Sequence, residues 1–149
     1  MLFRRLGGGL SQQRQVNQDT MEKFLFIIRE DLRKLKQWNE EERYIAVREM
    51  DKWVKTLVEK GNYISGDALR IAGSYVNKSQ VLSDGPFIEA KEGISGFMFM
   101  EAIDMQDAVL LAQSCSFVQS GDMAIEVRPL MGVKDIRELG DEGRTTTGG

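Results

Sequence analysis

The sequence predicts an α+β fold: a ferredoxin-like sheet with two helices on one face and an extra hairpin. Apolar runs of strand length alternate with amphipathic helical segments, in the order strand, helix, strands, helix, strand. The 149 residues suit a single domain large enough to bury a core. A single cysteine excludes an internal disulfide, and a chain of this length can form a core without one.

The first predicted strand is the apolar run at residues 24–28 (FLFII), which Arg29 and Glu30 end. Its short length and its aromatic and branched residues favour a strand over a helix. Residues at odd and at even positions are both apolar, so side chains on the two faces of this strand are apolar. We therefore expect both faces to be covered.

The first predicted helix opens at Asn39, a residue type that caps helix N-termini well. Three glutamates at 40–42 suit the positive end of the helix dipole. Apolar residues then recur at helical spacing between residues 45 and 58, and Gly61 follows as a typical C′ residue. We interpret this apolar stripe as core.

Three short strands are expected next, at residues 63–65, 68–76 and 80–82. The polar residues 77–79 can turn a hairpin between the last two. Residues 84–86 (Asp-Gly-Pro) interrupt the pattern, because proline lacks an amide donor and keeps the preceding residue extended.

Residues 94–102 (ISGFMFMEA) predict another strand, with Phe97 and Phe99 on one side and methionines on the other. Asp104 then caps a second helix, and Asp107 three residues later resembles a capping box.

The last predicted strand, residues 123–130, alternates between Ile125 and Val127 on one side and Glu126 and Arg128 on the other. Two helices can cover only one face of the resulting sheet. The other face still carries phenylalanine or methionine side chains, which would stay wet in a monomer. We therefore expect a homodimer that buries sheet against sheet.

Composition excludes several kinds of chemistry. The chain has no histidine and a formal net charge of −3. These values exclude a histidine-based triad and an ordinary zinc site, and they disfavour binding to nucleic acid. We expect no metal, no cofactor and no membrane span. The single cysteine favours a reducing compartment, so we expect a cytoplasmic protein.

The two ends differ from the middle. Residues 1–20 are rich in glycine, glutamine and asparagine, and we expect a flexible leader there. Residues 21–131 form the predicted domain. Residues 132–149 form a polar, mostly flexible tail in which residues 133–139 can make one helical turn.

The string DGPFIEAKE at residues 84–92 resembles the signature of the YCII-related proteins of the DGPF type. The resemblance runs from about Lys23 to Met131. It continues through residues 65–69 (SGDAL), Gly96-Phe97, residues 104–112 and residues 126–129 (EVRP).

This resemblance implies a dimeric α+β barrel, in which two ferredoxin-like units pack sheet to sheet. Some members resemble enzymes; one branch is proposed to use a histidine with an aspartate, and one relative is associated with removing chloride from a chlorinated hydroquinone. This chain has no histidine, so that mechanism does not carry over. A carboxylate with a pKa raised by burial would have to act as acid or base.

Asp84 is the best catalytic candidate from the sequence, although we favour the alternative that it is a turn residue bonding nearby amides, because turn chemistry alone explains an Asp-Gly pair. Arg128 is either a fork for a substrate carboxylate or half of a buried ion pair with Glu126, Asp84 or the other subunit. The predicted ligand pocket comprises Asp84, Phe87, Glu126 and Arg128.

Two functions follow as hypotheses. The first is a homodimeric protein that binds an unidentified small molecule, with catalysis by a pocket carboxylate left open. The alternative is a non-catalytic dimeric regulatory or interaction module. A link to sigma-factor signalling would suit that alternative, because DGPF proteins are often encoded near extracytoplasmic-function sigma factors.

Overall fold

The computed structural model describes residues 21–83, 93–132 and 135–139. The described chain contains, in order, β1 (Glu22–Glu30), α1 (Leu32–Gln37), α2 (Glu40–Glu59), β2 (Tyr63–Ala68), β3 (Ser74–Val76), β4 (Val81–Ser83), β5 (Gly93–Ala102), α3 (Met105–Gln113), α4 (Ser116–Ser120) and β6 (Met123–Pro129). Residues 135–139 add a short helical segment.

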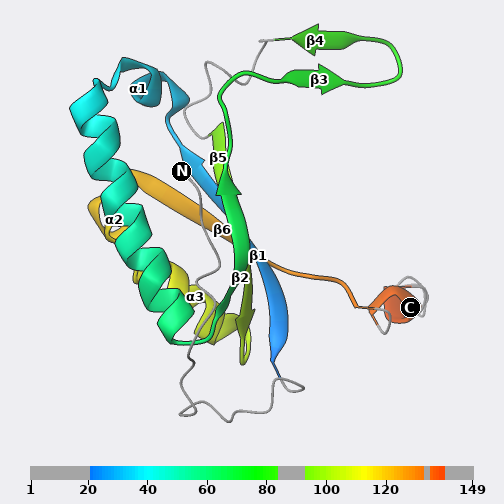
Figure 1. Cartoon of the computed structure of the whole chain (residues 1–149). Coiled ribbons are helices and arrows are strands. Elements are labelled where there is room, and N and C mark those ends of the chain that lie inside the picture. The colour runs from blue at the N-terminus through cyan, green and yellow to red at the C-terminus, as the bar shows by residue number, and fades with distance from the viewer. Residues whose placement is uncertain (1–20, 84–92, 133–134, 140–149) are drawn as a thin grey trace.

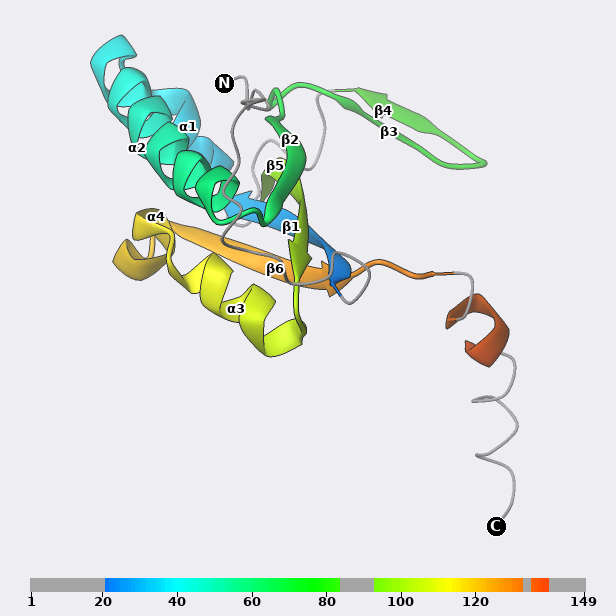
Figure 2. The same ribbon diagram turned by 60° about the horizontal axis from the view of Figure 1, so that its bottom comes forward.

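Four strands form one antiparallel sheet in the order β2-β5-β1-β6, and β3 pairs with β4 in a separate hairpin. Figures 1 and 2 show α1, α2, α3 and α4 on one side of the sheet, while the β3–β4 hairpin projects toward the other side. The predicted α+β class is confirmed, and the extra hairpin is present.

The core lies between the sheet and the helices. Alternate residues of the central strands face it, because successive strand side chains point to opposite faces. The buried cluster joins Phe24, Phe26 and Ile28 of β1, Met98, Met100 and Ala102 of β5, Met50, Trp53, Val54 and Leu57 of α2, and Ala108, Leu111 and Ala112 of α3. The orientations predicted for the phenylalanines and methionines of β5 are confirmed.

Both ends of α2 follow the predicted local chemistry. The Asn39 side chain accepts a hydrogen bond from the Glu42 amide at 2.8 Å, which satisfies one of the free donors of the first turn. Gly61 has φ of 77°, a left-handed conformation that suits glycine after a helix. The indole Nε1 of Trp53 donates to Ser114 Oγ at 2.9 Å, which ties α2 to the end of α3.

The start of α3 is also confirmed. The Asp104 carboxylate accepts from the Asp107 amide at 2.8 Å, and the Asp107 carboxylate accepts from the Ile103 amide at 3.0 Å. The reciprocal bond therefore reaches the residue before the cap, a variation on the predicted capping box.

Two predictions about the elements are wrong. The helix side of the sheet carries α1 and α4 in addition to the two predicted helices. These two helices have only six and five residues and no long apolar stripe, so the sequence pattern did not reveal them. Residues 68–76 do not form one strand: β2 ends at Ala68, and the chain leaves the sheet before β3 begins at Ser74. The last bond at that edge is from the Leu69 amide to the Ser95 carbonyl, at 2.8 Å.

The hairpin turn was predicted correctly. The backbone N–H of Asn77 donates a hydrogen bond to the Gln80 carbonyl at 3.0 Å, as expected for a turn that joins antiparallel strands. Its side-chain oxygen accepts from the amides of Ser79 and Gln80. A polar side chain that bonds amides two and three residues ahead is the usual reason for asparagine in such turns.

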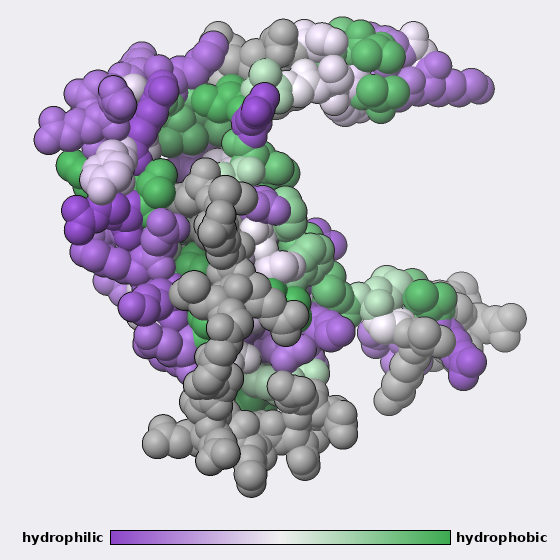
Figure 3. Space-filling view, in the orientation of Figure 1, coloured by the Kyte–Doolittle hydropathy of each residue, from purple (hydrophilic) through white to green (hydrophobic). Residues whose placement is uncertain are grey.

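The face of the sheet opposite the helices, which we call the open face, is less well covered. Leu25, Ile27, Phe97 and Phe99 are half-buried there, and the two phenylalanine rings meet edge to face at 5.8 Å. We predicted that both faces of the first strand are covered. Within one chain, only the face of β1 that packs against the helices is fully buried. Figure 3 shows apolar surface along the sheet and on the projecting hairpin, in contrast to the hydrophilic outer side of α2.

We predict that Gly66→Ala destabilises the fold by about 1–3 kcal/mol. A Cβ at this position would lie 2.5 Å from the backbone oxygen of Phe97, so the β2–β5 pairing would have to shift. Urea unfolding measures the loss. Ser65→Ala is the control, because Ser65 is the exposed neighbour on the same strand; an equal loss in both variants would contradict the prediction.

Candidate functional site

A cavity of about 570 Å³ opens between the sheet, α1, α2, α4 and the chain that follows β2. We call it the Glu30 cavity, after the one acidic residue among its described lining residues. Most of its wall is apolar, with large side chains contributed by Ile28, Trp38, Val47, Met50, Leu69 and Phe117. A space of this size and character suits an apolar small molecule.

Glu30 enters the cavity because it continues the alternation of β1. Phe24, Phe26 and Ile28 face the helices, and Glu30 shares their parity as the last residue of the strand. It pairs with Met123 of β6 and with Gly93 of β5, which are both buried. Gly93 is also the residue that follows the DGPF segment in the sequence.

A β-bulge brings Ser95 to this carboxyl group. Ile28 pairs with Gly96 and Arg29 pairs with Ile94, so Ser95 is an extra residue in β5. Such a bulge re-aims a side chain, and here the Ser95 hydroxyl donates a short hydrogen bond to Glu30 Oε2. Without the bulge, Ser95 would have the parity of the phenylalanines on the open face.

Burial is the main reason why the pKa of Glu30 is raised above its ordinary value. The hydrogen bond from Ser95 acts in the opposite direction, and the nearby carboxyl of Asp122 adds to the increase. A carboxyl group with a raised pKa can exchange a proton nearer to neutral pH than an exposed one. Glu30 can therefore act as a hydrogen-bond anchor or as an acid or base.

Cys115 is fully buried at the start of α4. Burial raises the pKa of its thiol, and the carboxyl group of Glu30 adds to that increase. The protonated thiol is the poorer nucleophile, so this cysteine is better described as core packing.

Two arginines, Arg43 of α2 and Arg70 of the segment after β2, also line the cavity. Both are exposed. Within residues 21–83, 93–132 and 135–139, neither forms an ion pair. The site thus combines an apolar interior, one half-buried carboxyl group and two exposed cationic groups.

The residues predicted from the sequence lie elsewhere. Glu126 and Arg128 of β6 share the open face, and an ion pair of 3.2 Å joins them. Glu126 also accepts from Arg29 at 2.9 Å, and these arginines hold its pKa below the ordinary value. Of the two predictions for Arg128, the structure shows the ion pair with Glu126. The pair is not buried as predicted, because the Arg128 side chain is exposed.

Asp84 and Phe87 lie outside the described residues, so their assignment to a ligand pocket stays a prediction. The structure brings Glu126 and Arg128 together with Arg29, on the opposite face of the sheet from the Glu30 cavity. Sequence reasoning missed Glu30 because it ended the first strand too early. Its parity with Phe24 and Phe26 is the signal that could have found it.

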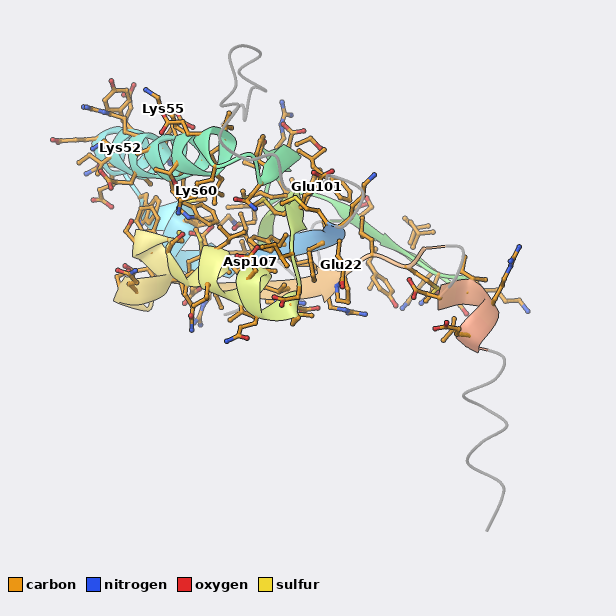
Figure 4. The ribbon with its side chains drawn as sticks, turned by 90° about the horizontal axis from the view of Figure 1, so that it is seen from below. Glu22, Lys52, Lys55, Lys60, Glu101 and Asp107 are labelled. Carbon is orange, nitrogen blue, oxygen red and sulfur yellow. The ribbon has the colours of Figure 1, made fainter. Side chains whose placement is uncertain are left out.

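Other charged side chains are spread over the molecule. Figure 4 labels six of them, from α2 and its C-terminus, β1, β5 and α3: Glu22, Lys52, Lys55, Lys60, Glu101 and Asp107. None of these six is among the described residues that line the cavity. Among the described residues, no three acidic, cysteine or histidine side chains are grouped to hold a metal ion.

No helix in the described part of the chain is long and apolar enough to cross a membrane. A family model for the YCII-related domain matches residues 21–133. No curated protein matches the chain. The family match covers well over half of the sequence, so the chain belongs to the YCII-related domain family, as its resemblance predicted.

We predict that Glu30→Gln changes how stability depends on pH. In the native state the raised pKa makes Glu30 hold its proton above 4.5, the ordinary value, where the unfolded chain releases it. The stability that comes from protonated Glu30 is therefore present below that value and is lost as pH rises through the raised pKa. Relative to wild type, the glutamine variant should gain stability over that interval, as measured by urea unfolding across pH.

Glu126→Gln is the control with the opposite sign. Arg29 and Arg128 lower the pKa of Glu126, so its contribution is present above the ordinary value of 4.5 and is lost as pH falls. The two variants should shift the stability profile in opposite directions. Profiles for Glu30→Gln and wild type that stay parallel throughout would show that Glu30 is not desolvated.

Proposed function

We propose that this member of the YCII-related domain family is a homodimer that binds an apolar small molecule in the Glu30 cavity. The observation that carries the proposal is the cavity itself, about 570 Å³ in volume and largely apolar, with the half-buried carboxyl group of Glu30 in its wall. Ligand sites typically pair an apolar lining with a few polar groups that orient the ligand. Glu30 and Ser95 supply such groups.

The same carboxyl group extends the proposal to catalysis. A chain without histidine needs another residue to transfer protons, and burial raises the pKa of Glu30 in the direction that an acid or base requires. The Ser95 hydroxyl would orient the carboxyl group, and the apolar wall would keep water away from the reacting atoms. Proton transfer to or from a bound ligand is the reaction type that this arrangement supports.

The open face supports the proposed homodimer. The strand order β2-β5-β1-β6 is the order of a ferredoxin-like unit, and two such units can close a barrel by packing their open faces. Half-buried Leu25, Ile27, Phe97 and Phe99 would then lose their remaining contact with water.

The β3–β4 hairpin, which projects on the side of the open face, adds further apolar surface. Tyr75, Val76 and Val81 of the hairpin are 49%, 66% and 64% exposed. A two-stranded hairpin alone is marginally stable in water, so a covering partner would stabilise it. Figures 1 and 2 both show the hairpin extending away from the helices, where a second copy on the open face would meet it.

We predict that the neutral fluorescent probe N-phenyl-1-naphthylamine binds in the cavity, and that Ala46→Trp raises its Kd at least about tenfold. Ala46 lines the cavity from α2, so an indole there would occupy the ligand's space. Fluorescence titration measures the affinity. Ile45→Trp places the same side chain on the exposed side of the helix and should leave the Kd unchanged.

Equal affinity in the wild type and in Ala46→Trp would contradict binding in this cavity. Such a result would assign the probe to another apolar surface, such as the open face. Far-ultraviolet circular dichroism of both tryptophan variants would verify that the fold is intact.

We predict that the wild-type chain sediments at equilibrium as two copies and that Phe99→Arg sediments as one. An arginine on the open face would place a charge in the middle of the proposed interface, where its desolvation is costly. Ile45→Arg adds the same charge on the outer side of α2 and should remain dimeric. A monomeric wild type at micromolar concentration would refute the proposed dimer.

A further inference from the structure

We propose that the ligand of the Glu30 cavity is an amphipathic anion, with an apolar body inside the cavity and an acidic group held by Arg43 and Arg70. This inference rests on the proposed function and names the chemical class of its ligand. It concerns molecules such as aromatic or aliphatic carboxylates and sulfonates, rather than neutral hydrocarbons or cations.

The pairing of the arginines is the first argument. Arg29 and Arg128 both pair with Glu126, and Arg33 pairs with Asp31 at 3.1 Å. By contrast, the two arginines that line the cavity form no ion pair with any residue in the described ranges. Arg43 has carboxylates nearby in the sequence, Glu40, Glu41 and Glu42, yet it forms an ion pair with none of them.

The position of the arginines is the second argument. Arg43 belongs to the N-terminal part of α2, whereas Arg70 follows β2 by two residues, so they reach the cavity from separate elements. Both are exposed although they line an apolar space. Arginine commonly packs its aliphatic stem on apolar surface and keeps its guanidinium in water. Two such groups can hold an acidic group while the rest of the ligand is buried.

The chemistry of the guanidinium is the third argument. Its planar fork of N–H donors matches the oxygens of a carboxylate or sulfonate and forms charge-assisted bonds that a neutral group cannot form. Glu30 lies at the end of β1 and its carboxyl oxygen accepts a hydrogen bond from the Ser95 hydroxyl, so it is already engaged with a neutral partner. No other acidic residue is among the described lining of the cavity.

Two probes with one ring system test the inference. 8-Anilinonaphthalene-1-sulfonate is N-phenyl-1-naphthylamine with an added sulfonate, so a comparison of their Kd values isolates the effect of the anionic group. For wild type we expect the sulfonate to bind about tenfold more tightly than the neutral probe. The preference should shrink as salt is added, because the guanidinium groups are exposed.

Arg43→Gln and Arg70→Gln should each reduce the preference, and together they should abolish it, while the Kd of the neutral probe stays unchanged. Arg48→Gln is the matched control. Arg48 lies on the same helix but over the ring of Tyr44, at 5.8 Å, and it does not line the cavity. Its loss should leave the preference intact.

The outcomes separate this inference from the proposed function. If the neutral probe binds and Ala46→Trp blocks it, but the sulfonate has no advantage, the cavity stands and the anionic ligand is refuted. A preference that survives the double glutamine variant also refutes the role of these arginines. If Ala46→Trp affects neither probe, or if neither binds, the proposed function fails and the inference fails with it.

Discussion

The position of β1 in the middle of the sheet is the constraint on which the rest of the structure depends. This strand pairs with β5 on one side and with β6 on the other, so its backbone bonds hold both neighbours in register. Its alternating side chains then define two chemically different faces. Phe24, Phe26 and Ile28 anchor the helices, whereas Leu25 and Ile27 belong to the open face.

Local sequence patterns predicted the parts of the fold that local chemistry controls. Asn39 and Asp104 begin helices because their side chains bond free amides of the first turn, and such caps can be identified in the sequence. Elements were missed where local signals are weak. In α1 only Leu32 is buried, and tertiary packing rather than periodicity explains why this segment is helical.

The candidate site was less predictable, because it depends on register. The sequence led to the hypothesis of a carboxyl group with a pKa raised by burial, and the structure has such a group at Glu30, a residue that the sequence pattern did not single out. Ser95 reaches Glu30 through a β-bulge, and nothing in the string ISGFMFMEA marks where an extra residue interrupts the pairing. Arg43 and Arg70 line the same cavity only in the folded chain, in which β2 has joined the sheet and α2 has packed on it.

The two glutamates at the sheet surfaces show why environment, rather than residue type, identifies the candidate. Glu126 is held by Arg29 and Arg128, and the lowered pKa of its carboxyl group is that of a satisfied, solvated ion. Glu30 is partly removed from water and forms no ion pair among the described residues, and the Ser95 group that hydrogen-bonds to it is a neutral hydroxyl. Acidic groups whose pKa is shifted by desolvation in a cleft are concentrated at functional sites. This difference in environment is why we propose the Glu30 cavity, rather than the ion pairs of the open face, as the ligand site.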